Sequence, residues 1–146
     1  MKRILALLLA AFMALTAFPA VAAEPAELRR FARELRLTDI DGFVATVQAI
    51  RDTGRLPERY LDKDDAAKLG WRPGADLCRI APGKMIGGDR FMNREGRLPN
   101  AAGRRWTEAD LDYGCGRRNA RRLVFSSDRL IFVTIDHYET FRQVPR

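Results

Sequence analysis

The sequence is poor in the side chains that most often build metal and cofactor sites. Its 146 residues include one His and two Cys, which excludes a multi-His metal centre, an all-cysteine zinc site and a disulfide-dense small scaffold. Aromatic residues make up only 9% of the chain, yet hydrophobic residues reach 47%, which indicates a folded domain rather than a disordered chain. The length allows one domain of modest size. We therefore expect ordinary side chains to carry any chemistry, without cofactor or metal.

A long apolar run occurs only once, at the start of the chain. Residues 4–18 are almost wholly apolar, follow two basic residues, and lead through a proline to small residues at 20–23. This order is typical of a secretory signal peptide, and the run is short for a membrane span. We expect residues 1–23 to be removed, which leaves a secreted protein, periplasmic or extracellular, with no stable membrane association.

Acidic residues are outnumbered by basic ones. The chain has 19 Asp and Glu against 26 Lys and Arg, a formal net charge of +7. The leader holds two of the cations and no acid, so the exported part carries +5. A small basic exported protein suits a polyanionic target such as nucleic acid, anionic lipid or acidic glycan, although the same charge also serves solubility alone.

The two cysteines, Cys78 and Cys115, would meet an oxidising compartment after export. That setting favours a disulfide over two buried thiols. The bridge would close a loop of about 37 residues and contribute about 4 kcal/mol in the chain-entropy account.

Helical patterns dominate the first half of the exported chain. Residues 24–39 put apolar side chains on one helical face and arginines elsewhere, which fits an amphipathic helix, a pro-segment or a frayed arm. The domain that follows, 40–146, begins with a helix that we expect Asp41 to cap and Gly54 to end. A second helix is predicted after Asp62, whose side chain can accept from the first-turn amides.

Strand patterns follow. Residues 105–111 alternate with period two, which puts Glu108 and Asp110 on the polar, solvated face of a strand. Residues 120–126 and 129–135 are two further strands joined by a tight turn. This order predicts an α+β fold, with N-terminal helices packed on one face of a C-terminal antiparallel β-sheet.

Candidate chemistry gathers in the same C-terminal half. His137 is the only imidazole and follows an apolar strand; its ordinary pKa suits general acid–base work, and a surface histidine without a role is the alternative. Four arginines within 117–122 repel one another unless an acid or a phosphate lies opposite, and Asp110 can be that acid.

Two further features have both a plain and a functional interpretation. Lys63 falls in the first turn of a predicted helix, where the dipole disfavours a cation, so either the neighbouring aspartates compensate it or it faces an anion. A glycine pair at 87–88 precedes the segment 91–96, which is either an ordinary hairpin loop or a loop whose amides and carboxylate read a base edge.

Several motifs occur together in a fixed order. They are APGK at 81–84, IGGD at 86–89, NREGRLP at 93–99, WTEAD at 106–110, RNARR at 118–122 and DHYETF at 136–141. In order and spacing the chain resembles the barnase/binase-type extracellular guanyl-preferring ribonucleases, the microbial ribonuclease family. The likeness runs from about 40 to 141 and is dense from 81 onward.

The resemblance implies a role for individual residues. Glu108 matches the general base, His137 the general acid, and Asp110 the acid that holds the arginines. The phosphate-binding cations and the aromatic residue beside the acid match Lys63, Arg118, Arg122 and Tyr138. The guanine-recognition loop matches Phe91, Met92, Asn93, Arg94 and Glu95, with Glu95 reading the base.

The resemblance also implies a reaction and partners. Single-stranded RNA is cut on the 3′ side of guanosine by a metal-independent transesterification to a 2′,3′-cyclic phosphate, then hydrolysed to a 3′-phosphate. We expect a monomer that is inhibited inside the producing cell by a small acidic protein related to barstar. The chain departs from the family pattern at Met92, Arg117, Arg121 and Arg129, where the family has a small polar, an aromatic, an acidic and an aromatic residue.

Two other functions are compatible with the same residues. One is a non-catalytic basic protein that binds nucleic acid on the same fold; turnover of a dinucleotide separates it from an enzyme. The other is a cationic protein that acts on membranes, which requires an amphipathic surface helix within 24–38.

Overall fold

The computed structural model describes residues 25–146, so the predicted signal peptide lies outside the described residues. The helices are α1 (Pro25–Glu34), α2 (Ile40–Thr53), α3 (Lys63–Lys68) and a 3-10 turn, η1 (Leu77–Arg79). The strands are β1 (Tyr60–Leu61), β2 (Met85–Phe91), β3 (Trp106–Asp110), β4 (Arg122–Ser126), β5 (Ile131–Thr134) and β6 (Arg142–Gln143). Within this described range, none of the helices has the length and apolar character that a membrane crossing requires.

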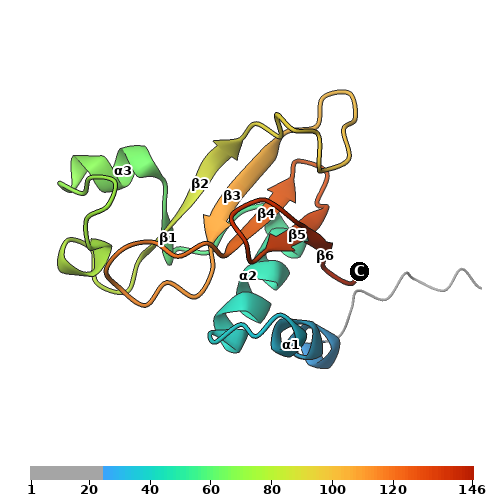
Figure 1. Cartoon of the computed structure of the whole chain (residues 1–146), viewed down its shortest axis with the longest axis horizontal. Helices are drawn as coiled ribbons and strands as arrows, with labels where there is room; N and C mark the ends of the chain where they lie inside the picture. Colours follow the sequence, from blue (N-terminus) through green and yellow to red (C-terminus); the bar gives the residue numbers. More distant parts are fainter. Residues whose placement is uncertain (1–24) are drawn as a thin grey trace, which may run out of the picture.

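The strands form one sheet in which each strand pairs with the one before it in the chain (Figure 1). Strands β2 to β6 are antiparallel, whereas β1 runs parallel to β2, so the sheet is mixed. The parallel pair arises because α3 and η1 form a crossover that returns the chain to the same end of the sheet. The predicted α+β fold is confirmed, with β1 as the one strand that departs from an antiparallel arrangement.

The start of α2 differs from the prediction. Asp39, not Asp41, caps the helix: its carboxylate accepts from the main-chain amide of Gly42 at 2.9 Å. A cap must stand before the first helical residue and reach the amide of the third, and Asp41 already lies inside the first turn. The predicted end is confirmed, because Gly54 follows the last helical residue in the left-handed conformation at φ 73°.

Helices α1 and α2 share one hydrophobic core with the sheet. The buried side chains of α1 are Leu28, Phe31 and Ala32, and the ring of Phe31 stacks on that of Phe43 in α2. Both helices lie together below strands β3 to β5 in Figure 1. The segment 24–39 therefore contains a docked helix, and the apolar face that a membrane-active helix would present is buried in the molecule.

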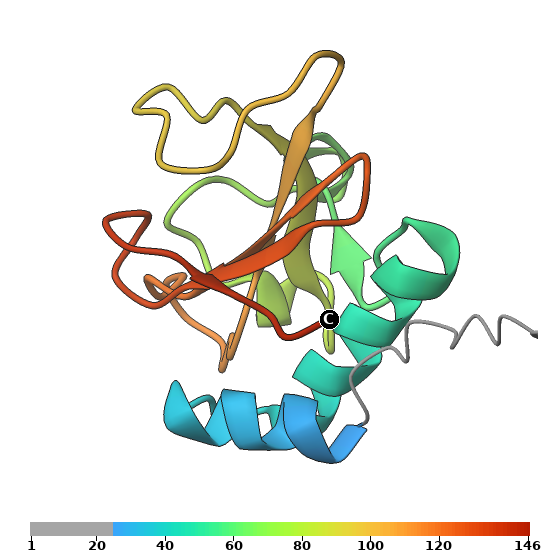
Figure 2. The same cartoon turned by 90° about the vertical axis from the view of Figure 1, so that its right-hand side faces the viewer.

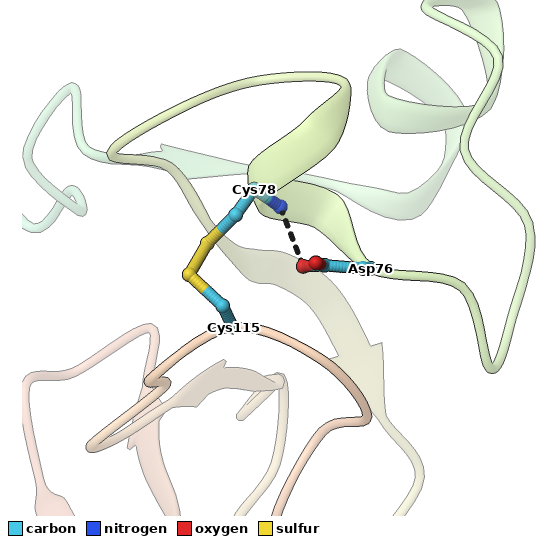
Figure 3. Close-up of side chains that lie close together, drawn as sticks. All are labelled: Asp76, Cys78 and Cys115. Atoms are coloured by element: carbon cyan, nitrogen blue, oxygen red, sulfur yellow. Dashed lines mark hydrogen bonds between the residues drawn. A yellow bond between two sulfur atoms is a disulfide. The ribbon is translucent and has the colours of Figure 1, made fainter.

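The predicted disulfide between Cys78 and Cys115 is present, with a Cα–Cα separation of 5.4 Å. It joins η1 to the loop between β3 and β4. Beside it, the Asp76 carboxylate accepts from the amide of Cys78 at 3.0 Å (Figure 3). It also accepts from the amide of Gly116 at 2.9 Å. The disulfide and these hydrogen bonds therefore fix the loop between β3 and β4 to the segment that carries η1.

Candidate active site

The face of the sheet opposite α2 is charged at one end. Strand register places Asp110, Arg122 and Thr134 side by side on β3, β4 and β5, with Glu108 in the next row on the same face. The predicted alternation is confirmed, but the predicted solvation is wrong: Glu108 is 8% exposed and Asp110 1%. Side chains from distant loops cover this face, and a strand pattern cannot reveal them. In Figure 2 the loops after β2 and β5 project to the left of the sheet, and α2 lies to its right.

Asp110 is paired with two arginines. The Nη2 of Arg118 lies 2.6 Å from Asp110 Oδ1, and its Nε donates to both carboxylate oxygens. The Nε of Arg122 lies 3.1 Å from the same Oδ1, in ion-pair contact. Burial acts to lower the pKa of Arg118, but the hydrogen bonds and charge of Asp110 raise it above its ordinary value. Two fixed cations are thus held beside the site.

Glu108 is held through both carboxylate oxygens. Its Oε1 accepts from Lys63 Nζ at 3.0 Å, and its Oε2 accepts from the hydroxyl of Tyr138. Lys63 reaches this carboxylate because it is the first residue of α3, whose cap Asp62 accepts from the amide of Asp65. Burial and the bond to Glu108 raise the pKa of Tyr138 well above its ordinary value, which keeps its hydroxyl a proton donor.

His137 lies at the exposed side of the same tyrosine. The ring centroids of His137 and Tyr138 are 4.9 Å apart, so Tyr138 contacts both the imidazole and the carboxylate of Glu108. Both residues have positive φ, 54° and 73°, an uncommon conformation for side chains of this size. The amide of His137 donates to the carbonyl of Ala120, and that of Tyr138 to the hydroxyl of Thr134. The chain bends sharply here, which brings the Tyr138 hydroxyl to the charged face and leaves the exposed His137 ring beside that of Tyr138.

The predicted base-reading loop begins beside this cluster. The ring of Phe91 stacks on that of Tyr138, with centroids 4.9 Å apart, so one of its faces is already covered. Asn93 is buried, and its side-chain amide bonds both the N–H and the carbonyl of Leu98 at 3.0 and 2.9 Å. Asn93 therefore closes the loop. The remaining three residues of the predicted set are exposed: Met92, Arg94 and Glu95.

Asp89 belongs to this site, although the sequence assigned it no role. It is the cross-strand neighbour of Glu108 and accepts from the main-chain amide of Lys63 at 3.2 Å. Burial raises the pKa of its carboxyl, with Lys63 opposing and Glu108 adding to that shift. The register shifts between Gly87 and Asp89, so simple alternation does not assign Asp89 to a face. The IGGD motif was the only feature of the sequence that drew attention to Asp89.

The glycine at the start of this bulge is required by packing. A Cβ at Gly87 would lie 2.6 Å from a ring carbon of Tyr60 and 2.9 Å from the Cβ of Ala109. The backbone of β2 can therefore approach β1 and β3 only where the side chain is absent. This close approach brings Asp89 and Glu108 under the first turn of α3.

A basic pocket of about 240 Å³ continues the site past Lys63. Its walls come from the loop after α3 and from the arginine-rich loop. They are Lys63, Trp71, Pro73, Gly74, Arg117 and Arg118. Arg117 thus lines the extension of the site, beside the cations that contact Asp110 and Glu108.

Metal ligands are scarce in residues 25–146. The one group of His, Cys and carboxylate side chains close enough to share an ion is Asp76 with Cys78 and Cys115. Both sulfurs are consumed in the disulfide and cannot act as thiolate ligands. The charged face instead offers a fixed carboxylate, an imidazole and several cations, which can exchange protons around an anionic group and stabilise its charge.

Comparison with known proteins points to one chemistry. A family model described as ribonuclease matches residues 44–145. A ribonuclease of Heyndrickxia coagulans is 57% identical over 91 residues, which cover 62% of this chain and 84% of that protein. Ribonucleases of Bacillus intermedius and Bacillus pumilus are also 57% identical over 91 residues. These cover 62% of this chain and 56% of each of those two proteins, so the match spans about half their length.

Proposed function

The chain belongs to the ribonuclease family, and we propose that it is a secreted endoribonuclease that cleaves single-stranded RNA after guanosine without a metal. One observation carries the proposal: Tyr138 contacts the carboxylate of Glu108 and the imidazole of His137, on a face lined with cations. The proposed base and the proposed acid therefore both lie next to one tyrosine, which supports a reaction in which they act on the same phosphodiester.

The first step of the proposed reaction uses the ribose 2′-hydroxyl as nucleophile. Glu108 takes the proton of that hydroxyl as its oxygen attacks phosphorus, and protonated His137 gives a proton to the departing 5′-oxygen. The product is a 2′,3′-cyclic phosphate. In the second step the roles reverse: neutral His137 takes a proton from the water that attacks phosphorus, the bond from phosphorus to the 2′-oxygen breaks, and protonated Glu108 gives its proton to that oxygen, which leaves a 3′-phosphate. DNA lacks the nucleophile and is not cut by this route.

The cations support the charge that builds on the phosphate oxygens. Arg118 is fixed by a forked contact with Asp110, so its remaining donors are oriented before substrate arrives. Lys63 lies 3.0 Å from the carboxylate of Glu108, the proposed general base, so it adds a further cation beside the reacting phosphate. Activity should follow a bell-shaped pH profile, with the two limbs belonging to the coupled pair Glu108 and His137.

Guanine preference is proposed from the loop 91–96. Asn93 ties the loop into one shape from within, and Glu95 stands exposed on it, where a carboxylate can accept from a base edge. Export is proposed from residues 1–23, and the disulfide supports an oxidising destination, periplasmic or extracellular. A monomer with an acidic intracellular inhibitor related to barstar suits the basic site, since association would be fast and salt-sensitive.

The test is digestion of a defined RNA that contains one guanosine in an unpaired stretch. Cleavage after that guanosine, a 2′,3′-cyclic phosphate that gives way to a 3′-phosphate, and full activity in excess EDTA are expected. The matched substrate has 2′-deoxyguanosine at the same position and should stay intact. Cleavage of the deoxy substrate, 5′-phosphate products or a metal requirement would each contradict the mechanism.

Two substitutions test the assigned roles. Glu108→Gln and His137→Asn keep size and polarity but remove the proton transfer, so each should lower turnover by about 10²–10⁴-fold. Asp52→Asn, at an exposed position on α2, is the charge-matched control for Glu108→Gln and should cleave as the wild type does. If the wild-type protein binds RNA but never turns it over, the non-catalytic nucleic-acid-binding alternative is correct.

A further inference from the structure

Arg121 lies in the arginine-rich run but points away from the charged face. Its neighbours Arg118 and Arg122 contact Asp110, whereas its own side chain crosses to the linker between α1 and α2. The Nη1 of Arg121 donates to the carbonyl of Arg36 and to Asp112 Oδ2, both at 2.6 Å. This arginine, whose side chain is 30% exposed, therefore links the arginine-rich loop to that linker instead of joining the charged face.

Asp112, the acidic partner of Arg121, also binds the linker between α1 and α2. Its side chain is 6% exposed and accepts from the main-chain amides of Thr38 and Asp39 at 3.0 and 2.9 Å. Asp112 also adopts a positive φ of 54°, which turns the chain out of β3 and into the arginine-rich loop. One carboxylate thus fastens that loop to the linker between the first two helices.

Asp112 connects to Arg122 through Asn119. The amide of Arg121 donates to the side-chain oxygen of Asn119, whose Nδ2 donates to the carbonyls of Leu111 and Asp112. The Nη1 of Arg122 donates in turn to the carbonyls of Asn119 and Arg121, at 2.6 and 2.7 Å. The two carbonyls that orient the Arg122 guanidinium therefore belong to the residues that this network holds.

The anchor of the network lies outside the part of the chain that the family model matches. That match starts at residue 44, whereas Arg36 and α1 precede it. α1 is fixed to the core by its buried apolar side chains, so the Arg36 carbonyl is a firm attachment point. The hydrogen bond from Arg121 to the Arg36 carbonyl therefore connects the arginine-rich loop to the linker that directly follows α1.

We propose that Arg121 is a positioning residue for Arg122. By binding Asp112 and the Arg36 carbonyl, it holds the two carbonyls that orient the Arg122 guanidinium toward the phosphate. The proposal rests on the proposed function, since Arg122 is there a phosphate-binding cation. A direct contact of Arg121 with RNA is the competing role, and the two roles differ in what they change: orientation alters turnover, whereas an RNA contact alters substrate affinity and its salt dependence.

The experiment compares cleavage kinetics of Arg121→Ala, Arg121→Lys and Arg142→Ala in the otherwise intact protein. Arg142 on β6 is the matched control: it also ties the sheet to α1, through Glu34 at 3.0 Å, and its loss removes the same charge. Arg121→Ala should lower kcat by about 2- to 30-fold, the range of coupling through packed networks, with KM unchanged. Arg121→Lys, which keeps the ion pair with Asp112, should recover most of the loss, and Arg142→Ala should cleave as the wild type does.

A double substitution identifies the route of the effect. In an Arg122→Ala background, adding Arg121→Ala should change kcat no further, because a positioning residue has nothing left to position. A readout independent of activity is the NMR signal of the Arg122 side-chain Nε–H, which should broaden in Arg121→Ala and stay sharp in Arg142→Ala. If the wild-type protein cleaved no RNA, the proposed function would fail while this signal still tested whether Arg121 positions Arg122.

Three results would overturn the proposal. A rise in KM with a shallower salt dependence would make Arg121 an RNA contact. An equal loss of kcat in the Arg122→Ala background would make its action independent of Arg122. An equal loss in Arg142→Ala would assign the effect to net charge or to general loosening of α1.

Discussion

The face of the sheet under α1 and α2 is apolar, whereas the opposite face carries charges, although both are built from the same three strands. On the first face Ala109, Leu123 and Val133 lie in one row, each at most 1% exposed. On the second face the next row, Asp110, Arg122 and Thr134, is at most 3% exposed. Burial is nearly equal, but its consequences differ. An apolar side chain gains free energy by leaving water, while each buried charge needs a partner.

The difference makes the charged face interdependent. Its charged groups balance one another: Asp110 balances the charge of Arg118 and Arg122, and Lys63 balances that of Glu108. The apolar face supplies the stability on which this arrangement depends. Loss of one apolar group should therefore lower the stability of the whole fold without changing the site. Loss of one charge should leave its partner buried without an opposite charge and damage the site.

The largest expected effect follows from Asp110→Asn. This change leaves Arg118 and Arg122 without their carboxylate, and removing one member of a buried pair typically costs about 3–5 kcal/mol. The free energy of unfolding, measured in urea, should fall by that amount, and RNA cleavage by the folded fraction should fall with it. The control is Asp128→Asn, which breaks a surface pair between the half-exposed Asp128 and Arg104 and should cost much less stability than Asp110→Asn. Wild-type stability in Asp110→Asn would show that water, not Asp110, compensates the arginines.

Leu123→Ala tests the apolar face at the residue of β4 that directly follows Arg122. Leu123 is fully buried, and truncation of such a side chain costs about 2–5 kcal/mol through lost burial and a residual cavity. The unfolding midpoint should fall, while kcat of the molecules that remain folded should stay at the wild-type value. A large loss of kcat well below the unfolding transition would mean that packing on the apolar face controls the geometry of the charged face, so that the two faces are not independent.

Local signals in the sequence predicted α2, α3 and strands β3 to β5, but not strands β1, β2 and β6 or the chemistry of the charged face. Asp62 and Gly54 mark helix ends through bonds and torsions within their own turns, and the alternation along 105–111 needs only neighbouring residues. The burial of Glu108 depends on Lys63 and Tyr138, which lie 45 and 30 residues away and meet it only in the folded sheet. The roles proposed for those residues came from the family resemblance.

The N-terminal segment was unpredictable for a related reason. An amphipathic pattern shows that a helix can form, but not what its apolar face will meet. The apolar face of α1 packs into the core with Phe43, whose ring stacks on that of Phe31, and Arg142 lies 5.1 Å from the centroid of the same Phe31 ring. Asp89 was missed because the bulge after Gly87 breaks the alternation that assigns residues to faces. Tertiary contact and register, not propensity, decided both cases.

The disulfide joins η1 to the loop that carries Arg118, outside both faces of the sheet, so its removal should affect stability more than the charged face. Cys78→Ala with Cys115→Ala should lower the free energy of unfolding by about 2–4 kcal/mol, because the unfolded chain regains the freedom of the closed loop. The bond from the Gly116 amide to Asp76 remains, so the loop that carries Arg118 should keep its place and kcat should change little. Calorimetry and cleavage assays on the folded protein measure the two effects. Lost activity with unchanged stability would mean that the bridge serves the charged face alone.

The smallest expected effect concerns Tyr60, where the two faces touch. Its ring packs with Ala109 on the apolar face, while its hydroxyl donates to the main-chain carbonyl of Asp110 at 2.9 Å. Burial raises the pKa of Tyr60 to about 12, against about 10 for an unfolded tyrosine. Below pH 10 both states keep the proton, so this group adds no pH dependence. Between pH 10 and 12 only the unfolded chain ionises, and stability falls as pH rises.

Two pKa units correspond to about 2.7 kcal/mol, an upper value for the stability that Tyr60 loses across this interval. Tyr60→Phe should cost about 1 kcal/mol near neutrality for the lost hydrogen bond. As pH rises from 10 to 12 only the wild type loses the Tyr60 contribution, so this difference in the free energy of unfolding should close and then reverse in sign. Urea unfolding of both proteins at each pH gives the difference in their free energies of unfolding. The other tyrosines and the lysines contribute equally to both proteins, so the pH dependence of this difference comes from Tyr60 alone. A gap that stayed constant with pH would mean that water reaches the phenol in the folded protein, and that the apolar face is not dry where it meets Asp110.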